Sequence, residues 1–390
     1  MEITVTERVP AETFTPGEFL RDELEARGWT QGDLAEILGL SLRLVNEVIA
    51  GKRAITPETA KRLGEAFGTG AQFWMNLETA HQLSRTRVDQ SAISRRARLF
   101  GMAPIKEMIR RHWLEQSDNI NVLEKQVLDF FAIKIIDEEP KWLPHAARKS
   151  TAYAQVTAAQ RAWLSRARHL ARATSAKPFR DSLVDEALNR LRPLAHDPEE
   201  ARRIPRILAE CGIRFLVIEP LQQTRIDGAC FWLDARSPVV VLSVRYDRID
   251  AFWHTLIHEL AHVKNRDATS NDWMLDVDLI NDNRTAGEER PEAEKKADEF
   301  AVNYLVPPEA LEDFITRIRP LYSKKKIIGF ASTIGVHPGI VVGQLQFRKE
   351  ITYAQNREML VKVREFVVQS TLTDGWGNFP SASFVIEARA

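Results

Sequence analysis

The stretch WHTLIHELAHV, residues 253–263, lies within residues 249–263, where apolar residues recur at helical spacing. Its two histidines, His258 and His262, are four positions apart. On a helix these positions share one face, so both imidazoles stand at the separation that a tetrahedral zinc ion requires. Glu259, on the adjoining flank, can accept a proton from water at the metal. Because the motif is short, a helix with two ordinary histidines is the alternative.

The residues before this helix favour a sheet. Residues 213–218, 229–233 and 239–244 are apolar runs of strand length, separated by glycine, aspartate and proline. Strands followed at once by the helix give the arrangement of zinc peptidases, in which an edge strand holds extended substrate. We therefore expect an α+β, zincin-like domain over residues 205–350.

A catalytic zinc site needs a third protein ligand, so that the fourth position is left for water. The helix expected at residues 291–305 supplies one, because Glu294 and Asp298 lie on the same face, one turn apart. We predict Glu294 as the ligand, and Asp298 as the carboxylate that accepts the second N–H of a ligand histidine. Other acids in this acidic region compete for the ligand role: Glu292, Glu299, Asp276 and Asp278.

Further motifs follow the histidine pair. The chain reads EKKADEFA at residues 294–301, LVPP at residues 305–308 and GVHPGIVVG at residues 335–343. With the HELAH motif, these segments resemble the ImmA/IrrE family of metallopeptidases, over roughly residues 205–347. In that family an HExxH helix precedes a Glu-x-x-Ala-Asn/Asp-x-Phe-Ala helix with a Leu-x-x-Pro-like ending.

The resemblance implies zinc bound by His258, His262 and Glu294, with Glu259 as the catalytic acid/base. Members of the family cleave or inactivate DNA-binding repressors, often in stress or mobile-element regulation, so the implied partner is a repressor or antitoxin-like protein. One departure is His254, which stands where members commonly have an apolar aromatic residue. We expect His254 to be a packed residue rather than an extra ligand.

Residues 15–83 carry the capping signals of five short helices. Threonine followed by proline starts two of them, and glycine ends most of them. In the second helix, which starts at Thr30, we expect Leu34, Ile37 and Leu38 to be buried.

The segment TQGDLAEILGLSLRLVNEVIAG, residues 30–51, has the spacing of a helix-turn-helix. Small Ala35 lets the two helices cross closely, and Gly39 makes the turn. With its flanking helices the segment resembles the Cro/C1-type domain, and residues 14–83 resemble HigA-type antitoxins. The resemblance implies a double-stranded DNA operator as partner. It also suggests a homodimer, since such proteins usually read two half-sites.

A recognition helix that starts at Ser41 would present Leu42, Arg43, Asn46 and Glu47 outward. Arg43 can bind guanine, Asn46 can bind adenine, and Leu42 can contact a thymine methyl group. The alternative is a protein-binding module, which Glu47 and the low net charge leave open. We expect phosphate contacts, as in such domains, from three further residues: Gln31, Lys52 and Arg53.

Composition limits the class of protein. The chain has 390 residues, a formal net charge of +0 and 44% apolar residues, which describes a globular protein of more than one domain. Its apolar runs are far shorter than a membrane span, and its N-terminus lacks the pattern of a signal peptide. The only two cysteines are Cys211 and Cys230. We expect a cytoplasmic protein in which both are small buried residues rather than a redox switch.

The architecture we predict has four parts. A helix-turn-helix domain at residues 1–83 is followed by a helical connector at 84–204, the zinc-peptidase domain at 205–350 and an extension at 351–390. The function we infer is a regulator that combines DNA binding with zinc-dependent proteolysis of a repressor, an antitoxin-like protein or itself. The alternative is a non-proteolytic repressor or antitoxin whose peptidase fold senses a signal or binds a partner.

Overall fold

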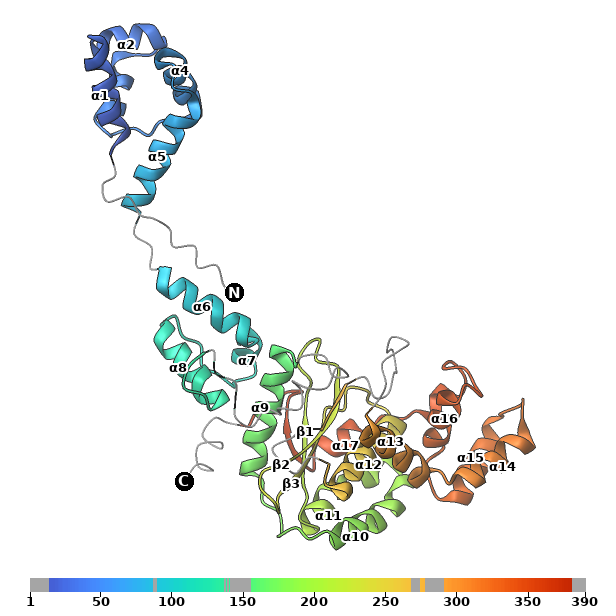
Figure 1. Ribbon diagram of the computed structural model, residues 1–390. Coiled ribbons are helices and arrows are strands. Elements are labelled where there is room, and N and C mark those ends of the chain that lie inside the picture. The colour runs from blue at the N-terminus through green and yellow to red at the C-terminus, as the bar shows by residue number, and fades with distance from the viewer. Residues whose placement is uncertain are drawn as a thin grey trace. The chain divides into compact units, whose positions relative to one another are not determined.

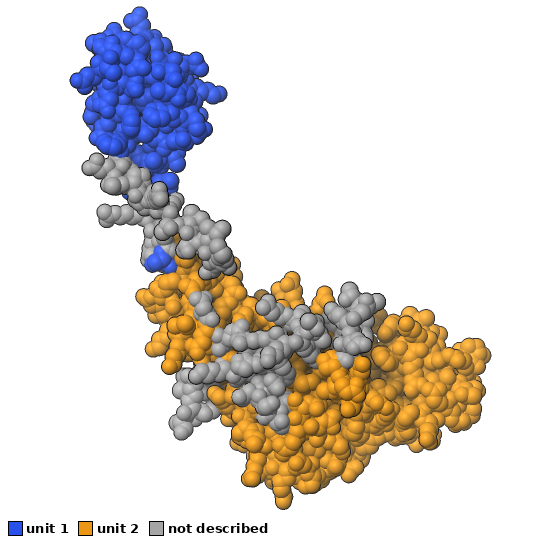
Figure 2. Space-filling model, viewed as in Figure 1, with its two compact units in different colours: residues 1–91 blue, residues 92–390 orange. Residues whose placement is uncertain are grey.

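The computed structural model describes residues 14–86, 90–136, 138, 140, 156–267, 274–277 and 291–380. The chain divides into two compact units, residues 1–91 and 92–390, which are coloured separately in Figure 2.

The first unit contains five helices, which are drawn in blue in Figure 1. Four of them carry labels there: α1, α2, α4 and α5. Their apolar faces meet in one core around Trp74, Leu34 and Leu63, which are almost completely buried. Burial of each such side chain stabilises the fold by about 1.5–3 kcal/mol. The helices are α1 (Pro16–Arg27), α2 (Gln31–Leu38), α3 (Leu42–Ile49), α4 (Pro57–Phe67) and α5 (Ala71–Arg85).

Caps fix where these helices begin and end. Thr15 and Glu18 satisfy each other's backbone N–H groups at the start of α1, and Gly28 ends that helix in the left-handed conformation, with φ 66°. Gly39 ends α2 in the same way, with φ 62°. The prediction that Ile37 is buried is wrong, since 49% of it is exposed. The buried stripe of α2 is centred between Leu34 and Leu38, and Ile37 lies about a quarter-turn or more away from it.

The second unit contains one mixed sheet, with the strand order β4-β2-β3-β1-β5. β1 runs parallel to β3 and β5, whereas β2 runs antiparallel to β3 and β4. Three of the strands were expected from their apolar runs. β4 and β5 were not, because segments of four and three residues show no period. The strands are β1 (Arg214–Ile218), β2 (Ile226–Trp232), β3 (Pro238–Leu242), β4 (Met274–Val277) and β5 (Leu372–Asp374).

Apolar residues cover both faces of this sheet. Leu216 and Val241 belong to a core shared with the helices of residues 90–173. Their chain neighbours Phe215 and Val240 belong to the core on the opposite face, as the alternation of side chains along a strand requires. The helices on the first face are α6 (Gln90–Met102), α7 (Ile105–Arg110), α8 (Ile120–Phe131) and α9 (Ala158–Ala173). All of these helices lie in the segment that the sequence predicted as a connector.

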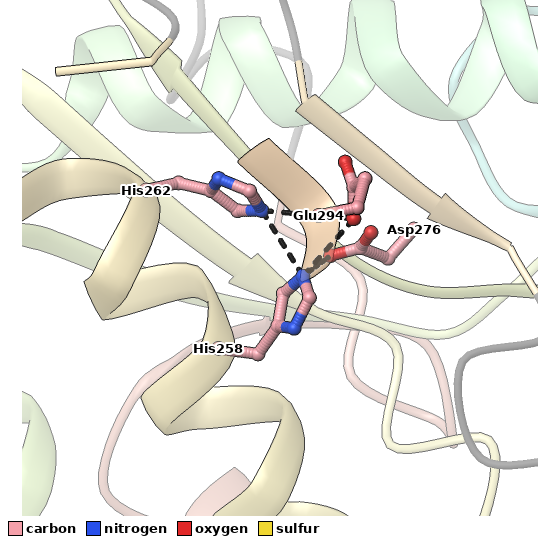
Figure 3. Close-up of side chains that lie close together, drawn as sticks. All are labelled: His258, His262, Asp276 and Glu294. Atoms are coloured by element: carbon pink, nitrogen blue, oxygen red, sulfur yellow. Dashed lines mark hydrogen bonds and ion pairs between the residues drawn. The ribbon is translucent and has the colours of Figure 1, made fainter. Parts of the chain in front are cut away.

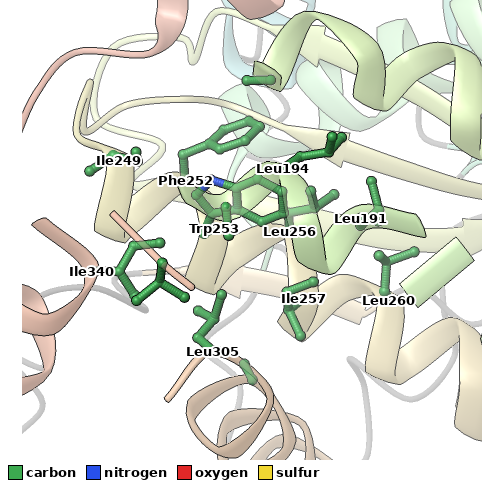
Figure 4. Packing of buried hydrophobic residues seen from close by; sticks show 14 of the residues in the cluster. Leu191, Leu194, Ile249, Phe252, Trp253, Leu256, Ile257, Leu260, Leu305 and Ile340 are labelled. Carbon is green, nitrogen blue, oxygen red and sulfur yellow. The ribbon is translucent and has the colours of Figure 1, made fainter. Parts of the chain in front are cut away.

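The second face is packed against α12 (Ile249–Asn265). Trp253, Leu256, Ile257 and Leu260 of this helix are completely buried and lie among apolar residues of neighbouring helices in Figure 4. Cys211 and Cys230 are free and buried, as expected. The other helices on this side are α10 (Ser182–Leu191), η2 (Arg192–His196), η3 (Pro198–Arg203), α11 (Ile204–Glu210), α13 (Glu292–Leu305), α14 (Pro308–Ile318), α15 (Lys324–Ile334), α16 (Pro338–Phe347), η4 (Arg357–Met359) and α17 (Arg364–Val368).

Among the described helices, none is both long and apolar enough on its own to cross a membrane. By length and composition alone, α15 and α16 meet that test only as a pair bent by 110°.

Candidate metal centre

Two helices and one strand bring four donor atoms together. α12 supplies His258 and His262, α13 supplies Glu294, and β4 supplies Asp276, with one ligand atom of each within 4.8 Å of the others. All four side chains are buried and point toward one another in Figure 3. α13 can approach α12 because its inward face carries the small, fully buried Ala297.

The spacing of the donor atoms matches a small tetrahedral cation. Nε2 of His258 lies 3.0 Å from Nε2 of His262, 3.2 Å from Oε2 of Glu294 and 3.1 Å from Oδ2 of Asp276. Nε2 of His262 lies 3.8 Å from the same Glu294 oxygen. Bonds of about 2.0–2.1 Å from zinc to nitrogen or oxygen imply separations of about 3.3–3.4 Å between the ligand atoms. The residues present therefore fit a zinc ion.

A carboxylate outside the cluster lies beside Nδ1 of each histidine. Nδ1 of His258 lies 2.9 Å from Asp298, and Nδ1 of His262 lies 2.9 Å from Asp267. If each Nδ1–H donates to its carboxylate, both Nε2 lone pairs face the same point. Two lone pairs 3.0 Å apart repel unless a cation lies between them. Carboxylates at this position are usual for metal-ligating histidines. Asp298 lies close to the ring of a predicted ligand, and its role as the acceptor of the second N–H stays a prediction.

Asp267 is a functional residue that sequence reasoning missed. Arg266 ends α12 in the left-handed conformation, with φ 57°. This turn is closed by hydrogen bonds from the N–H of Asp267 to the carbonyl of His262, at 3.1 Å, and from the N–H of Arg266 to that of Val263, at 3.2 Å. It folds the chain back so that the Asp267 carboxylate reaches the His262 ring. An acid just beyond the expected end of the motif helix was the available signal.

The electrostatics of the cluster favour a cation. Burial lowers the pKa of His258, but the carboxylates of Asp276, Glu294 and Glu259 together outweigh this effect and raise the pKa to about 10. Burial also opposes protonation of His262, yet hydrogen bonding to Asp267 helps to raise its pKa to about 9. Burial raises the pKa of Glu294, and both imidazoles lower it far below its usual range. The carboxylates thus stabilise positive charge at this point, which a divalent ion supplies while the imidazoles stay neutral.

Glu259 lies beside the cluster but is not one of its four donors. Its side chain is completely buried, and within the described residues neither carboxylate oxygen has a hydrogen-bond partner. Burial first, and the charge of Asp276 second, raise the pKa of Glu259 well above its usual value. The carboxylate rests on Gly228 of β2, where an added Cβ would lie 2.1 Å from Oε1. A buried, unpaired carboxyl group of this kind is suited to exchanging a proton with a bound molecule.

The remaining acids and His254 lie elsewhere. Glu292 and Glu299 are exposed on α13, and Asp278 falls outside the described residues. His254 is half-buried, with its ring centroid 6.2 Å from that of His258, and it is not among the four donors. Asp276, named from the sequence only as a competitor of Glu294, joins Glu294 in the cluster.

The predicted DNA contacts lie on exposed parts of the first unit. On α3, Leu42, Arg43 and Asn46 are exposed, and Ser41 caps the helix. Arg43 pairs with Glu47 at 2.9 Å, although 88% of the Arg43 side chain is accessible. An exposed pair of this kind is worth about 0–1 kcal/mol, so Arg43 can exchange its partner for a base. The predicted phosphate contacts are also exposed: Gln31, Lys52 and Arg53.

Two family models match the chain. One describes a helix-turn-helix and matches residues 20–74. The other describes the IrrE N-terminal-like domain, is the model of a peptidase family, and matches residues 211–345. The second match includes all four donors and Glu259, as well as Gly228. Both resemblances seen in the sequence are thereby confirmed.

Individual relatives match about a fifth of the chain. Virulence-associated protein I of Dichelobacter nodosus is 40% identical over 80 residues, which are 20% of this chain and 74% of that protein. The uncharacterized HTH-type transcriptional regulator YbaQ of Escherichia coli strain K12 is 39% identical over 70 residues, 18% of this chain and 62% of that protein. The solved antitoxin HigA of Pseudomonas aeruginosa, with the higBA promoter, is 40% identical, with a TM-score of 0.18, and the match covers 19% of this chain and 80% of that one. The chain therefore belongs to the helix-turn-helix family through residues 20–74, and its residues 211–345 match the IrrE N-terminal-like domain.

Proposed function

We propose that this chain is a cytoplasmic DNA-binding regulator whose second unit is a zinc-dependent peptidase. The observation that carries the proposal is the pair of Nε2 atoms, 3.0 Å apart, beside a buried and unpaired Glu259. The substrate class we propose is a repressor or antitoxin-like protein, with a segment of this chain itself as a further candidate. Its test is to incubate the zinc-loaded protein with repressors from neighbouring genes. Cleavage by the wild type but not by Glu259→Gln supports the proposal, and cleavage by neither contradicts it.

The residues of the site have separate tasks in this reaction. A bound zinc ion supplies Lewis acidity, which polarises a carbonyl group and makes water more acidic. His258, His262 and Glu294 would hold that ion, and Asp267 would orient one imidazole through Nδ1. Glu259 takes the proton from the attacking water and returns it to the leaving amine. Burial raises its pKa, which favours the second step, in which the group carries the proton before returning it.

A Gly228→Ala substitution is expected to lower proteolysis by about 10²-fold, because the added Cβ would displace the Glu259 carboxylate by an ångström or so. The loss should come from the displaced carboxylate rather than from misfolding, since the nearest atom ends a flexible side chain and Cγ2 of Thr255, at 2.9 Å, needs to move only slightly. Zinc content and thermal unfolding should stay close to the wild type. An unchanged cleavage rate would show that Glu259 does not act from its position over β2.

The first unit supports the DNA-binding half of the proposal. It belongs to a helix-turn-helix family, and α3 exposes Arg43 and Asn46, which have the geometry for guanine and adenine. Since such proteins usually read two half-sites, we further propose that the chain binds its operator as a homodimer.

Arg43→Ala and Asn46→Ala are each expected to weaken binding to the operator by about 1–3 kcal/mol, because each removes a side chain that hydrogen-bonds a base. Lys52→Ala should weaken binding to all duplexes alike, because a phosphate contact carries no sequence information. Fluorescence anisotropy with a duplex selected by the wild type from random sequences measures both effects.

Lys61→Ala, an exposed change on α4, is the control for loss of positive charge. Equal affinity of the wild type and the Arg43→Ala, Asn46→Ala double variant would favour the protein-binding alternative.

One observation favours a second candidate function. Asp276 adds a fourth protein donor to the cluster, and closed sets of four protein ligands are typical of structural zinc. In this candidate the second unit binds zinc without proteolysis and acts as a sensor or partner-binding module. Persistent cleavage activity that depends on Glu259 excludes it.

A further inference from the structure

β4 lies at the edge of the sheet, beside β2, where an extended peptide could pair as an additional strand. It pairs antiparallel with β2, and Asp276 stands opposite Gly228, the residue beneath the Glu259 carboxylate. Extended peptides commonly bind proteins by adding a strand to an exposed edge, through main-chain hydrogen bonds. The β2 groups that such a peptide would use are bonded to β4.

Asp276 brings a carboxylate from this strand to the metal centre. It is the one buried residue among the four of β4, with 4% of its surface exposed. Its Oδ2 lies 3.1 Å from Nε2 of His258. His258, His262 and Glu294 alone would leave one tetrahedral position open, as catalytic sites do. Asp276 fills that position from within the chain.

The side chains of β4 are less buried than those of the inner strands. Met274, Leu275 and Val277 are only half-buried, and the pairing with β2 is irregular between Ile226 and Gly228. Burying a carboxylate is costly unless a positive charge compensates it. The docking of β4 therefore depends on main-chain hydrogen bonds, on the charge at the metal centre and on the partial apolar packing of Met274, Leu275 and Val277. A competing strand can replace the main-chain hydrogen bonds.

We propose that β4 occupies the edge of β2 to which a substrate strand would bind, and that Asp276 keeps the site latent by filling the fourth coordination position of the metal. The inference rests on the proposed peptidase function, because it concerns the same site. A substrate strand that displaces β4, or a signal that moves β4 away from β2, would free both the fourth coordination position and the edge of β2. The two candidate functions then correspond to a closed and an open state of one site.

The test uses cobalt in place of zinc, because cobalt reports its ligands by visible absorption, and acetohydroxamate as a small probe for an open ligand place. With the full chain at saturating cobalt, Asp276→Ala is expected to shift the absorption bands and to bind acetohydroxamate at least about tenfold more tightly than the wild type. An occupant present nine-tenths of the time reduces apparent affinity by this factor. Asp276→Asn, which is nearly isosteric, should change both readouts in the same direction.

Asp227→Asn is the matched control. It removes the same charge from β2, where Asp227 is bound by Arg245 at 3.0 Å, and it should leave spectrum and probe affinity unchanged. Equal probe affinity in the wild type and both Asp276 variants would overturn the inference while leaving the peptidase proposal standing. Failure of the wild type to bind cobalt would overturn the metal centre itself, and the inference with it.

Discussion

Glu259→Gln is expected to lower the rate of proteolysis by about two to four orders of magnitude, the usual cost of removing proton transfer. Glutamine is close in shape to glutamate but cannot act as a base at neutral pH. Glu259 is not one of the four donors, so zinc content should stay near that of the wild type. The first unit has its own core, so operator affinity should not change. Cleavage of a partner repressor, followed by mass spectrometry of the fragments, measures the loss.

The same variant separates regulation by cleavage from regulation by binding. A reporter of the regulated promoter should fail to respond to its inducing signal in cells that carry Glu259→Gln. A full response, with cleavage abolished in the test tube, would show that proteolysis is dispensable. The second unit would then be a sensor or binding module.

His262→Ala is expected to hold far less than one zinc ion per chain. The substitution removes a buried donor and leaves Asp267 without the ring to which its oxygen lies 2.9 Å away. Losing even an outer-shell partner lowers metal affinity by about 10–100-fold, and losing a ligand costs more. The variant should also lose zinc-dependent stabilisation, which for the wild type amounts to about 2.7 kcal/mol at a zinc concentration 100 times its Kd. Metal analysis after dialysis and thermal unfolding with and without zinc measure these losses.

His254→Ala is the matched control, because it removes a neighbouring imidazole from α12 that is not among the four donors. It should retain its zinc. Full zinc retention by His262→Ala, or equal loss in both variants, would contradict the ligand assignment.

Local spacing explains what the sequence could predict. His258 and His262 lie one turn apart on a helix, and so do Glu294 and Asp298, so their grouping follows from helix geometry alone. The five N-terminal helices followed from capping residues, and three strands followed from continuous apolar runs.

The unpredicted features depend on contacts between distant segments or on a single turn. Asp276 joins the cluster only because β4 pairs with β2 in a register that no local period encodes. Asp267 depends on the left-handed turn at Arg266, a residue type that rarely adopts this conformation. Ile37 was placed inside because it is apolar, whereas the narrow buried stripe of α2 excludes it.

Zinc X-ray absorption of the purified wild type tests the central claim most directly. We expect one zinc ion per chain, with nitrogen and oxygen ligands at about 2.0–2.2 Å and the multiple scattering of two imidazoles. A shell of sulfur at about 2.3 Å would instead place a cysteine such as Cys230 on the metal. That result, or protein that stays free of zinc after incubation with an excess of it, would contradict a site built from His258, His262 and Glu294.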